Sequence, residues 1–384
     1  MSNEESNMQI VIRYARNKRA SDIHISEGKD IAYRIDGNIV LQKGAVVSRE
    51  EMIEYFASVG ISQKSLDELL AGRISAIDAS FEEGAGRYRV NIYMTSIGIC
   101  AAIRSFYDGI PRFKELNLPD CVEKFAYLRS GLVIITGVTG SGKSTTLASL
   151  IDLINETRSD NIITVEDPIE YVYKPKKCRI VQREKGRDFF DFSTAVREAM
   201  RQDPDVILVG ELRDIETIRN TITLAETGHL VFGTLHASST IDAVDRLTDA
   251  FDSNEKEMMR GIVSDVLKGV VYQYLVKREN GIGRVPLCEV MTVDNVIKNA
   301  LKENKKSAIK DRMRTSDVLG CVEFVDRCVE VVMNGDVRYE TIVQMLNEDE
   351  QKYFSEKYEK MKDMIVQDSD EDRPKLLKTN GLRR

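Results

Sequence analysis

The chain has 384 residues, enough for two or three domains, and 42% of them are hydrophobic and 30% charged. This composition is typical of a globular protein and excludes a largely disordered one. The net charge of −7 argues against nucleic-acid binding as the main activity, because that activity needs a basic surface. Since no apolar stretch approaches ~20 residues and the first residues are polar, we expect a cytosolic protein without a membrane span or signal peptide.

The first hundred residues predict a small α+β domain, assigned to residues 1–104. Its expected elements are a helix over 7–19, a strand over 21–26, a hairpin over 32–41, helical segments over 49–72 and short strands over 75–104. A linker is expected over 105–119, where Pro111 and Pro119 stand.

A glycine-rich loop, Gly137–Ser144, fits the P-loop pattern G-x-x-x-x-G-K-[ST]. The apolar stretch Leu132–Thr136 predicts a strand before it, and the spacing over Thr145–Ile154 predicts a helix after it. Glycines let backbone N–H groups turn toward phosphate oxygens, and the helix N-terminus adds positive charge. Lys143 can reach the outer phosphates of ATP, and the Ser144 hydroxyl can hold Mg²⁺. The residues predicted to bind the nucleotide are Gly137, Thr139, Gly140, Ser141, Gly142, Lys143, Ser144 and Thr145.

Three further apolar stretches predict strands that end in polar residues. They are Asn161–Val165 before Glu166, Val206–Val209 before Glu211, and Leu230–Leu235 before His236. Such strands alternating with helices predict an α/β fold with a parallel sheet, in which ligands bind beyond the carboxyl ends of the strands. Glu166 and Glu211 are therefore candidates for the acids of ATP hydrolysis, although either could instead cap the next helix.

Histidines and arginines supply the remaining candidates. His229 and His236 would lie ~23 Å apart on an extended strand, so they cannot share a metal ion. His236 could sense the γ-phosphate, whereas His229 is expected to be structural or at an interface. Arg87, Arg89 and Arg104 cluster in the small domain, where arginines are usually solvated surface residues. Of these, Arg89 and Arg104 are the candidates to act on the nucleotide of a neighbouring subunit.

After Phe251 the pattern predicts mostly helices. A wide apolar face over Ile262–Leu275 predicts one continuous helix, within an ATPase core assigned to residues 120–290. A C-terminal helical region over 291–366 is expected to contain helices near 294–304, 315–334, 338–347 and 350–366. The apolar stripe of the last helix favours packing on the core over a groove for a partner. The polar residues 367–384 are expected to be disordered. The six cysteines form no Cys-x-x-Cys pair, which favours buried reduced thiols over a zinc site.

Four motifs in one order resemble the secretion ATPase superfamily. They are the P-loop, the box Ile162–Glu170, the atypical Walker B sequence Val206–Glu211 and the stretch Ala225–His236. Within this superfamily the chain resembles the type IV pilus retraction ATPases, called PilT. Matches to their N-terminal domain and linker lie at Ala20–His24, Arg89–Asn91 and Ile110–Pro119, and the resemblance covers about residues 8 to 345.

The resemblance implies a PAS-like N-terminal domain, a RecA-like P-loop ATPase domain and a helical C-terminal extension. It also implies a homohexamer at the cytoplasmic face of the inner membrane, docked on a pilus platform protein (PilC-like), with a paralogous pilus ATPase as a second candidate partner. Glu166 would be the base that polarises water, Glu211 would act at Mg²⁺ and the γ-phosphate, and His229 and His236 would belong to the His box.

The leading interpretation is a hexameric motor that retracts type IV pili. An accessory PilU-like ATPase stays open, because Val296–Glu303 departs from the usual retraction motif and an extra C-terminal helix is present. An assembly or type II secretion ATPase is disfavoured, since the four-cysteine clamp of those proteins is absent. The acidic chain argues against a RecA-like DNA translocase, and Lys143, Glu166 and Glu211 argue against a catalytically silent ring.

Overall fold

A computed structural model describes residues 6–35, 37–84, 86–106, 109–315 and 320–371. Contacts between residues divide the chain into two compact units. The first contains residues 1–111 and 158–203, and the second contains residues 112–157 and 204–384. Residues 158–203, predicted as part of the ATPase core, thus group with the N-terminal region.

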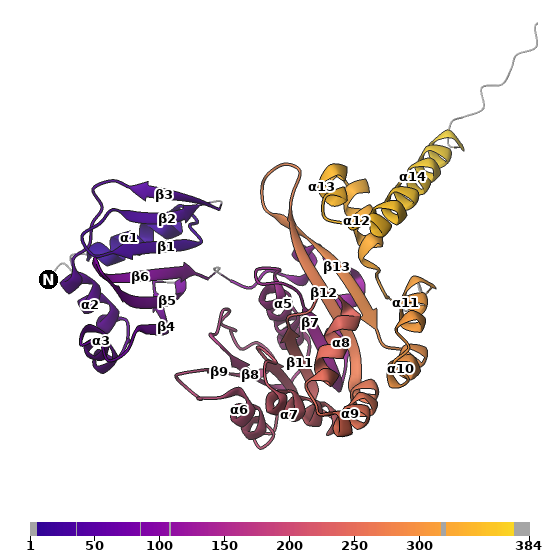
Figure 1. Cartoon of the computed structure of the whole chain (residues 1–384), viewed down its shortest axis with the longest axis horizontal. Helices are drawn as coiled ribbons and strands as arrows, with labels where there is room; N and C mark the ends of the chain where they lie inside the picture. Colours follow the sequence, from indigo (N-terminus) through magenta and orange to yellow (C-terminus); the bar gives the residue numbers. More distant parts are fainter. Residues whose placement is uncertain (1–5, 36, 85, 107–108, 316–319, 372–384) are drawn as a thin grey trace, which may run out of the picture. The chain divides into compact units, whose positions relative to one another are not determined.

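The N-terminal region of the first unit is built on a six-stranded antiparallel sheet in the order β3-β2-β1-β6-β5-β4 (Figure 1). Its strands are β1 (Asp22–Ser26), β2 (Ile31–Ile35), β3 (Asn38–Gln42), β4 (Ala76–Glu83), β5 (Gly86–Thr95) and β6 (Gly98–Ser105). Its helices are α1 (Asn7–Asn17), α2 (Arg49–Ser58) and α3 (Gln63–Leu70). Buried apolar residues of these helices and of alternate strand positions form one core, as the patterns predict.

The remainder of the first unit carries the parallel pair β8 (Asn161–Glu166) and β9 (Arg179–Glu184), followed by α6 (Phe192–Ala199). The register of the pair sets Glu166 opposite Glu184. Strand β8 was predicted, and β9 was not, because its alternate residues are polar and only half-buried.

The second unit contains five strands in the order β13-β12-β7-β11-β10. They are β7 (Gly131–Thr136), β10 (Val206–Val209), β11 (Leu230–Leu235), β12 (Leu267–Lys277) and β13 (Arg284–Thr292). Strands β10, β11, β7 and β12 run parallel, and β13 is antiparallel. Strands β7, β10 and β11 are buried throughout, which confirms the expected α/β class. The helices that connect the parallel strands include α5 (Lys143–Thr157), α7 (Ile215–Glu226), α8 (Thr240–Asp249) and α9 (Ser253–Val266).

The prediction of one continuous helix over Ile262–Leu275 was wrong. Helix α9 ends at Val266, and the chain continues directly into β12. A short apolar run rich in valine fits a buried strand as well as a helix, and the periodicity could not distinguish the two. Strand β13, which pairs with β12 along Gly269–Lys277, was missed for the same reason.

The C-terminal region is helical, as expected, but its described helices number five, one more than predicted, and most of them are shorter than the predicted ones. Asn117, which directly follows the one-turn linker helix Phe113–Leu116, donates to Asp336 of this region and accepts from Arg327. The helices of this region are α10 (Asn295–Lys302), α11 (Lys306–Thr315), α12 (Phe324–Met333), α13 (Tyr339–Val343) and α14 (Glu348–Glu371). Phe354 of α14 is fully buried in a core with α12 and β13, which supports packing as the role of the apolar stripe.

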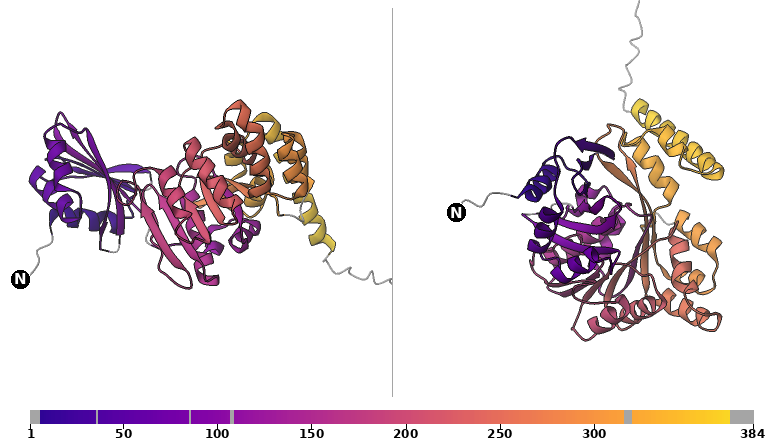
Figure 2. Two further views of the ribbon diagram at one scale, coloured as in Figure 1. Left: turned by 90° about the horizontal axis from the view of Figure 1, so that it is seen from below. Right: turned by 60° about the vertical axis from the view of Figure 1, so that its left-hand side comes forward.

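The C-terminal part of α14 extends away from the rest of its unit in Figure 1 and in the left view of Figure 2. The helix runs to Glu371, five residues beyond its predicted end at 366. Residues 372–384 of the tail that we expected to be disordered lie outside the described residues.

Candidate active site

The P-loop connects the end of β7 to the start of α5, as predicted. Gly137, Gly140 and Gly142 have φ angles of 145°, 78° and 89°, a region that favours glycine. Two of these glycines also lie against Gln273 of β12. A Cβ atom on Gly137 would stand 2.2 Å from the Gln273 carbonyl oxygen, and one on Gly142 would stand 2.7 Å from its Nε2 atom. The glycines are therefore required both by the backbone turn and by close packing.

Gln273 was not identified from the sequence, and its side chain on β12 binds the P-loop. Its buried side chain donates to the Ser141 carbonyl oxygen at 2.7 Å and accepts from the Thr146 hydroxyl at 2.8 Å. Lys143 bonds through Nζ to the carbonyl oxygens of Gly137 at 2.7 Å and Val138 at 3.1 Å. These bonds hold the P-loop in its turned conformation, and they hold the Lys143 side chain against the backbone of the loop.

Glu211 and His236 come together at the carboxyl ends of β10 and β11. The Glu211 carboxylate lies 3.4 Å from His236 Nε2 and pairs with Arg213 at 2.6 Å. Burial and the nearby charge of Lys143 lower the pKa of His236 below its ordinary value, outweighing the opposite effect of Glu211. His236 is therefore neutral at neutral pH and can accept or donate a hydrogen bond.

A surface hollow of about 340 Å³ opens beside this pair. Glu211, Arg213, His236 and Arg246 contribute its polar lining. Arg213 and Arg246 were not selected from the sequence, because isolated arginines on helices and loops are usually solvated. The hollow presents two cations and a carboxylate next to the end of β11.

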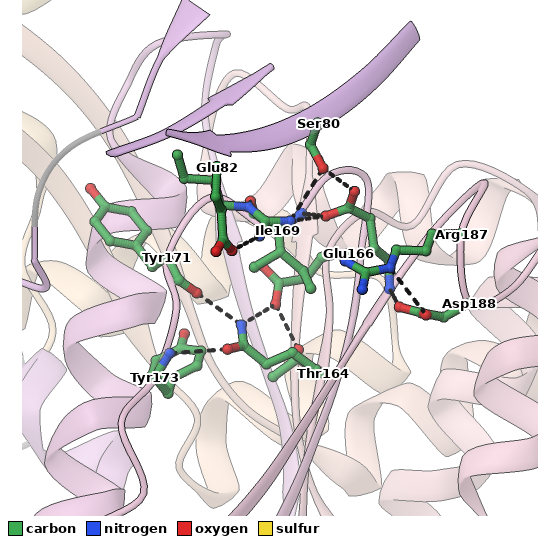
Figure 3. A network of polar contacts seen from close by, with 12 residues as sticks. Ser80, Glu82, Thr164, Glu166, Ile169, Tyr171, Tyr173, Arg187 and Asp188 are labelled. Carbon is green, nitrogen blue, oxygen red and sulfur yellow. Dashed lines mark hydrogen bonds and ion pairs between the residues drawn. The ribbon is translucent and has the colours of Figure 1, made fainter. Parts of the chain in front are cut away.

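Glu166 lies in the first unit, where one side chain of its own strand β8 and one of β9 hold its carboxylate (Figure 3). One oxygen accepts from the Thr164 hydroxyl at 2.6 Å and from Gln182 Nε2 at 3.2 Å. Burial raises the pKa of Glu166 to about 7, although these two hydrogen bonds act to lower it. A carboxylate with this pKa is suited to accept a proton near neutral pH.

The structure separates the two predicted histidines. His229 precedes β11, and its Nδ1 atom lies 2.9 Å from the Leu224 carbonyl oxygen and 3.1 Å from the Thr227 hydroxyl. Since His236 follows the same strand, the two lie at opposite ends of β11. His229 joins none of the described contacts of Lys143, Glu211 or His236, and its catalytic role stays a prediction.

The two predicted arginines are direct neighbours across β5 and β6, because Arg89 is the register partner of Arg104. Arg89 lies 3.8 Å from Asp78, and Arg104 bonds Asp22 at 2.9 Å. Their side chains are 43% and 63% exposed, so both guanidinium groups are accessible on the N-terminal sheet. Their role in a neighbouring active site also stays a prediction.

The donors proposed for Mg²⁺ suit that ion chemically. The Ser144 hydroxyl and the Glu211 carboxylate are hard oxygen ligands, and magnesium commonly takes only one or two of these from the protein. Within the described residues, no group of three or more histidine, cysteine or acidic side chains could hold a metal ion by itself.

A family model of type II/IV secretion system proteins matches residues 4–369 of the chain. The type IV pilus retraction ATPase PilT of Pseudomonas aeruginosa is 38% identical over 323 residues, which cover 83% of this chain and 92% of that protein. A twitching motility protein of Neisseria gonorrhoeae is 43% identical over 260 residues, or 67% of this chain and 70% of that protein.

A crystal structure of the pilus retraction motor PilT with bound ADP has the same fold. It matches with a TM-score of 0.83 and 39% identity, covering 91% of this chain and all of that one. The expected arrangement of a PAS-like N-terminal domain and a RecA-like ATPase domain is thereby confirmed. In the part of the chain that the structure describes, no helix has the length and apolar character needed to cross a membrane. Together, the family model and the two PilT matches show that the chain belongs to the type II/IV secretion system protein family, as an ATPase of the PilT-like kind.

Proposed function

We propose that this chain forms a ring of six that hydrolyses ATP with Mg²⁺ to retract type IV pili. The observation that carries the proposal is the complete P-loop, supported from β12 by Gln273, in a chain similar to PilT over most of its length. By this proposal the ring works at the cytoplasmic face of the inner membrane, docked on a platform protein, with a paralogous ATPase as a second candidate partner.

Each candidate residue has a defined task in hydrolysis. The backbone N–H groups of the P-loop and Lys143 hold the phosphates, and Glu166 accepts the proton of the attacking water. The raised pKa of Glu166 supports the latter role, because at about 7 it matches a base that works near neutral pH. Mg²⁺, held by Ser144 and Glu211, would neutralise the charge that develops on the phosphates. His236, which lies beside Glu211, would sense the γ-phosphate.

Arg89 and Arg104 act on the nucleotide of the next subunit. Their exposure on one sheet supports this assignment, since a residue that acts across an interface has to be accessible in the single chain. Closed rings arise from such heterologous interfaces. Light scattering in the presence of nucleotide is expected to report six chains, and a monomer at micromolar concentration would contradict the ring.

Deletion of the gene tests the cellular role. We expect surface pili to accumulate and twitching to stop, because pili would still be assembled but not withdrawn. Loss of surface pili would instead identify an assembly ATPase. An accessory role would be indicated if the deletion strain still retracts pili under low load and loses retraction only when a paralogous ATPase is also deleted.

A further inference from the structure

A third arginine of the N-terminal sheet, Arg87, differs from its exposed neighbours. Only 11% of its side chain is exposed, against 43% for Arg89 two residues later on β5. Its guanidinium group donates to the Ile169 carbonyl oxygen at 2.8 Å through Nε and to the Ser80 hydroxyl at 3.3 Å through Nη2. The same Nη2 atom is paired with Glu184. Arg87 is therefore directed into its own unit rather than toward a neighbouring subunit.

Glu184, the last residue of β9, completes this cluster. Its buried carboxylate accepts from Arg87, from the Ser80 hydroxyl and, at 3.0 Å, from the backbone N–H of Ile169. The ion pair of Arg87 and Glu184 thus binds both backbone polar groups of Ile169. Figure 3 shows Ile169 and Glu166 within one network of polar contacts.

The segment that follows Glu166 is held at two further points. Gln182 donates to the Tyr171 carbonyl oxygen at 2.8 Å and accepts from the Tyr173 N–H at 3.0 Å. The same amide group donates to the Glu166 carboxylate. Gln182 thus links the Glu166 carboxylate to the backbone of Tyr171 and Tyr173.

We propose that Arg87 is a positioning residue for ATP hydrolysis: together with Glu184 it fixes Ile169 and thereby the orientation of Glu166. The inference rests on the proposed role of Glu166 as the base. The N-terminal domain then serves hydrolysis within its own chain, a task separate from that of the exposed arginines. Movement of that domain against residues 158–203 would change the orientation of the base.

The chemistry of the pair favours positioning over simple stabilisation. A buried ion pair adds little net stability, because desolvation of the two charges offsets their attraction, and an apolar pair could fill the same space. What the arginine adds is a rigid fork of donors that sets a geometry. Lysine, a point charge on a flexible stem, cannot reproduce that fork.

The charge of Arg87 also acts on the base. Burial raises the pKa of Glu166, hydrogen bonds from Thr164 and Gln182 lower it, the carboxylate of Glu170 raises it and Arg87 lowers it. Neutralising Arg87 is therefore expected to raise the pKa of Glu166 further, whereas lysine would preserve the electrostatic effect. Position and charge can thus be separated by two substitutions at one site.

Steady-state kinetics of the full chain provide the test, with Arg87→Gln, Arg87→Lys and the control Arg49→Gln. Arg49 pairs with Glu27 in the same domain without contacting this cluster. We expect kcat to fall about 10-fold or more in both Arg87 variants with KM changed less than about 3-fold, because a misplacement of ~1 Å can cost up to 10²-fold. The acidic limb of the pH profile moves to higher pH only in Arg87→Gln. Arg49→Gln keeps the wild-type kcat and profile.

A double-mutant cycle shows whether Arg87 acts through Glu166. In a Glu166→Gln background, Arg87→Gln is expected to lower the residual rate by less than about 2-fold, because interacting residues are not additive. An equal loss in both backgrounds, or a wild-type kcat in Arg87→Gln, would overturn the inference. Wild-type turnover in Glu166→Gln alone would instead remove the proposed base. ADP binding and melting curves show whether each variant is folded. If Arg87→Gln unfolds, the double variant Arg87→Gln/Glu184→Gln is used in its place, and the kcat expected for it is the one expected for Arg87→Gln.

Discussion

The candidate residues fall into two halves, one in each unit, and the two halves are built in different ways. The phosphate half, in the second unit, consists of backbone and glycines contiguous in sequence, with Lys143 bonded to carbonyl oxygens five and six residues before it. The acid half, in the first unit, depends on side chains distant in sequence, such as Arg87 and Glu184, which are 97 residues apart. A local motif thus encodes the first half, whereas only the folded chain assembles the second.

The largest expected effect concerns the phosphate half. Lys143→Ala is expected to lower ATP turnover by about 10³-fold or more, because it removes the charge that stabilises the phosphates in the transition state. A colorimetric phosphate-release assay measures it. Lys268→Ala, which removes a lysine from β12 outside the P-loop, is the matched control. Turnover within 10-fold of wild type in Lys143→Ala would contradict the P-loop assignment.

The next largest expected effect concerns Arg89 and Arg104, the exposed arginines proposed to act on the nucleotide of a neighbouring chain. Arg104→Ala is expected to lower turnover by about 10³-fold, since an arginine supplied by a neighbour can contribute that much. Mixing it with Glu166→Gln creates some sites that combine an intact Glu166 with a neighbour's intact Arg104, and these regain activity. No recovery despite proven subunit exchange, with Arg89→Ala tested in the same way, would show that both arginines are structural.

Gln273 tests whether the backbone of the phosphate half needs support. Gln273→Leu leaves the Ser141 carbonyl and the Thr146 hydroxyl without this partner, a cost of about 1–3 kcal/mol for each buried group. We expect a lower melting temperature and about 10-fold weaker binding of fluorescent ADP, which corresponds to ~1.4 kcal/mol.

The matched control for Gln273 is Ser264→Ala. Ser264 is buried in α9 of the same unit and bonds the Gly261 carbonyl oxygen. It is expected to lower the melting temperature without changing ADP affinity. Wild-type ADP affinity in Gln273→Leu would show that the loop keeps its shape unaided.

The smallest expected effect concerns the ionisation of the acid half. Because burial raises the pKa of Glu166 to about 7, the fraction of ionised base falls as the pH drops through that value. We expect kcat to be about half its plateau near pH 7 and to decrease about tenfold per unit below it. The pKa of His236 is lowered, so His236→Ala is expected to leave this midpoint in place. A midpoint near 4.5 would contradict a buried base.

The sequence predicts the features that local patterns encode and misses those that depend on residues distant in the chain. The P-loop, the strand ends at Glu166, Glu211 and His236, and the α+β character of the N-terminal region follow from local patterns. Strands β12 and β13 were missed because short apolar runs fit two periodicities. Gln273 was missed with them, since a lone glutamine gains its role only when β12 lies beside the P-loop. Arg87 looked like its exposed neighbours, because burial of an arginine depends on partners that no local pattern reveals.

Complementation of a deletion strain links the site to the cellular role most directly. The strain would receive the wild-type gene or Glu166→Gln, expressed at equal levels, and surface pili would be counted by electron microscopy. The account predicts that the wild-type gene restores normal piliation and twitching, whereas Glu166→Gln leaves the cells with excess pili and no twitching. Normal retraction with Glu166→Gln, or a deletion strain without surface pili, would contradict it.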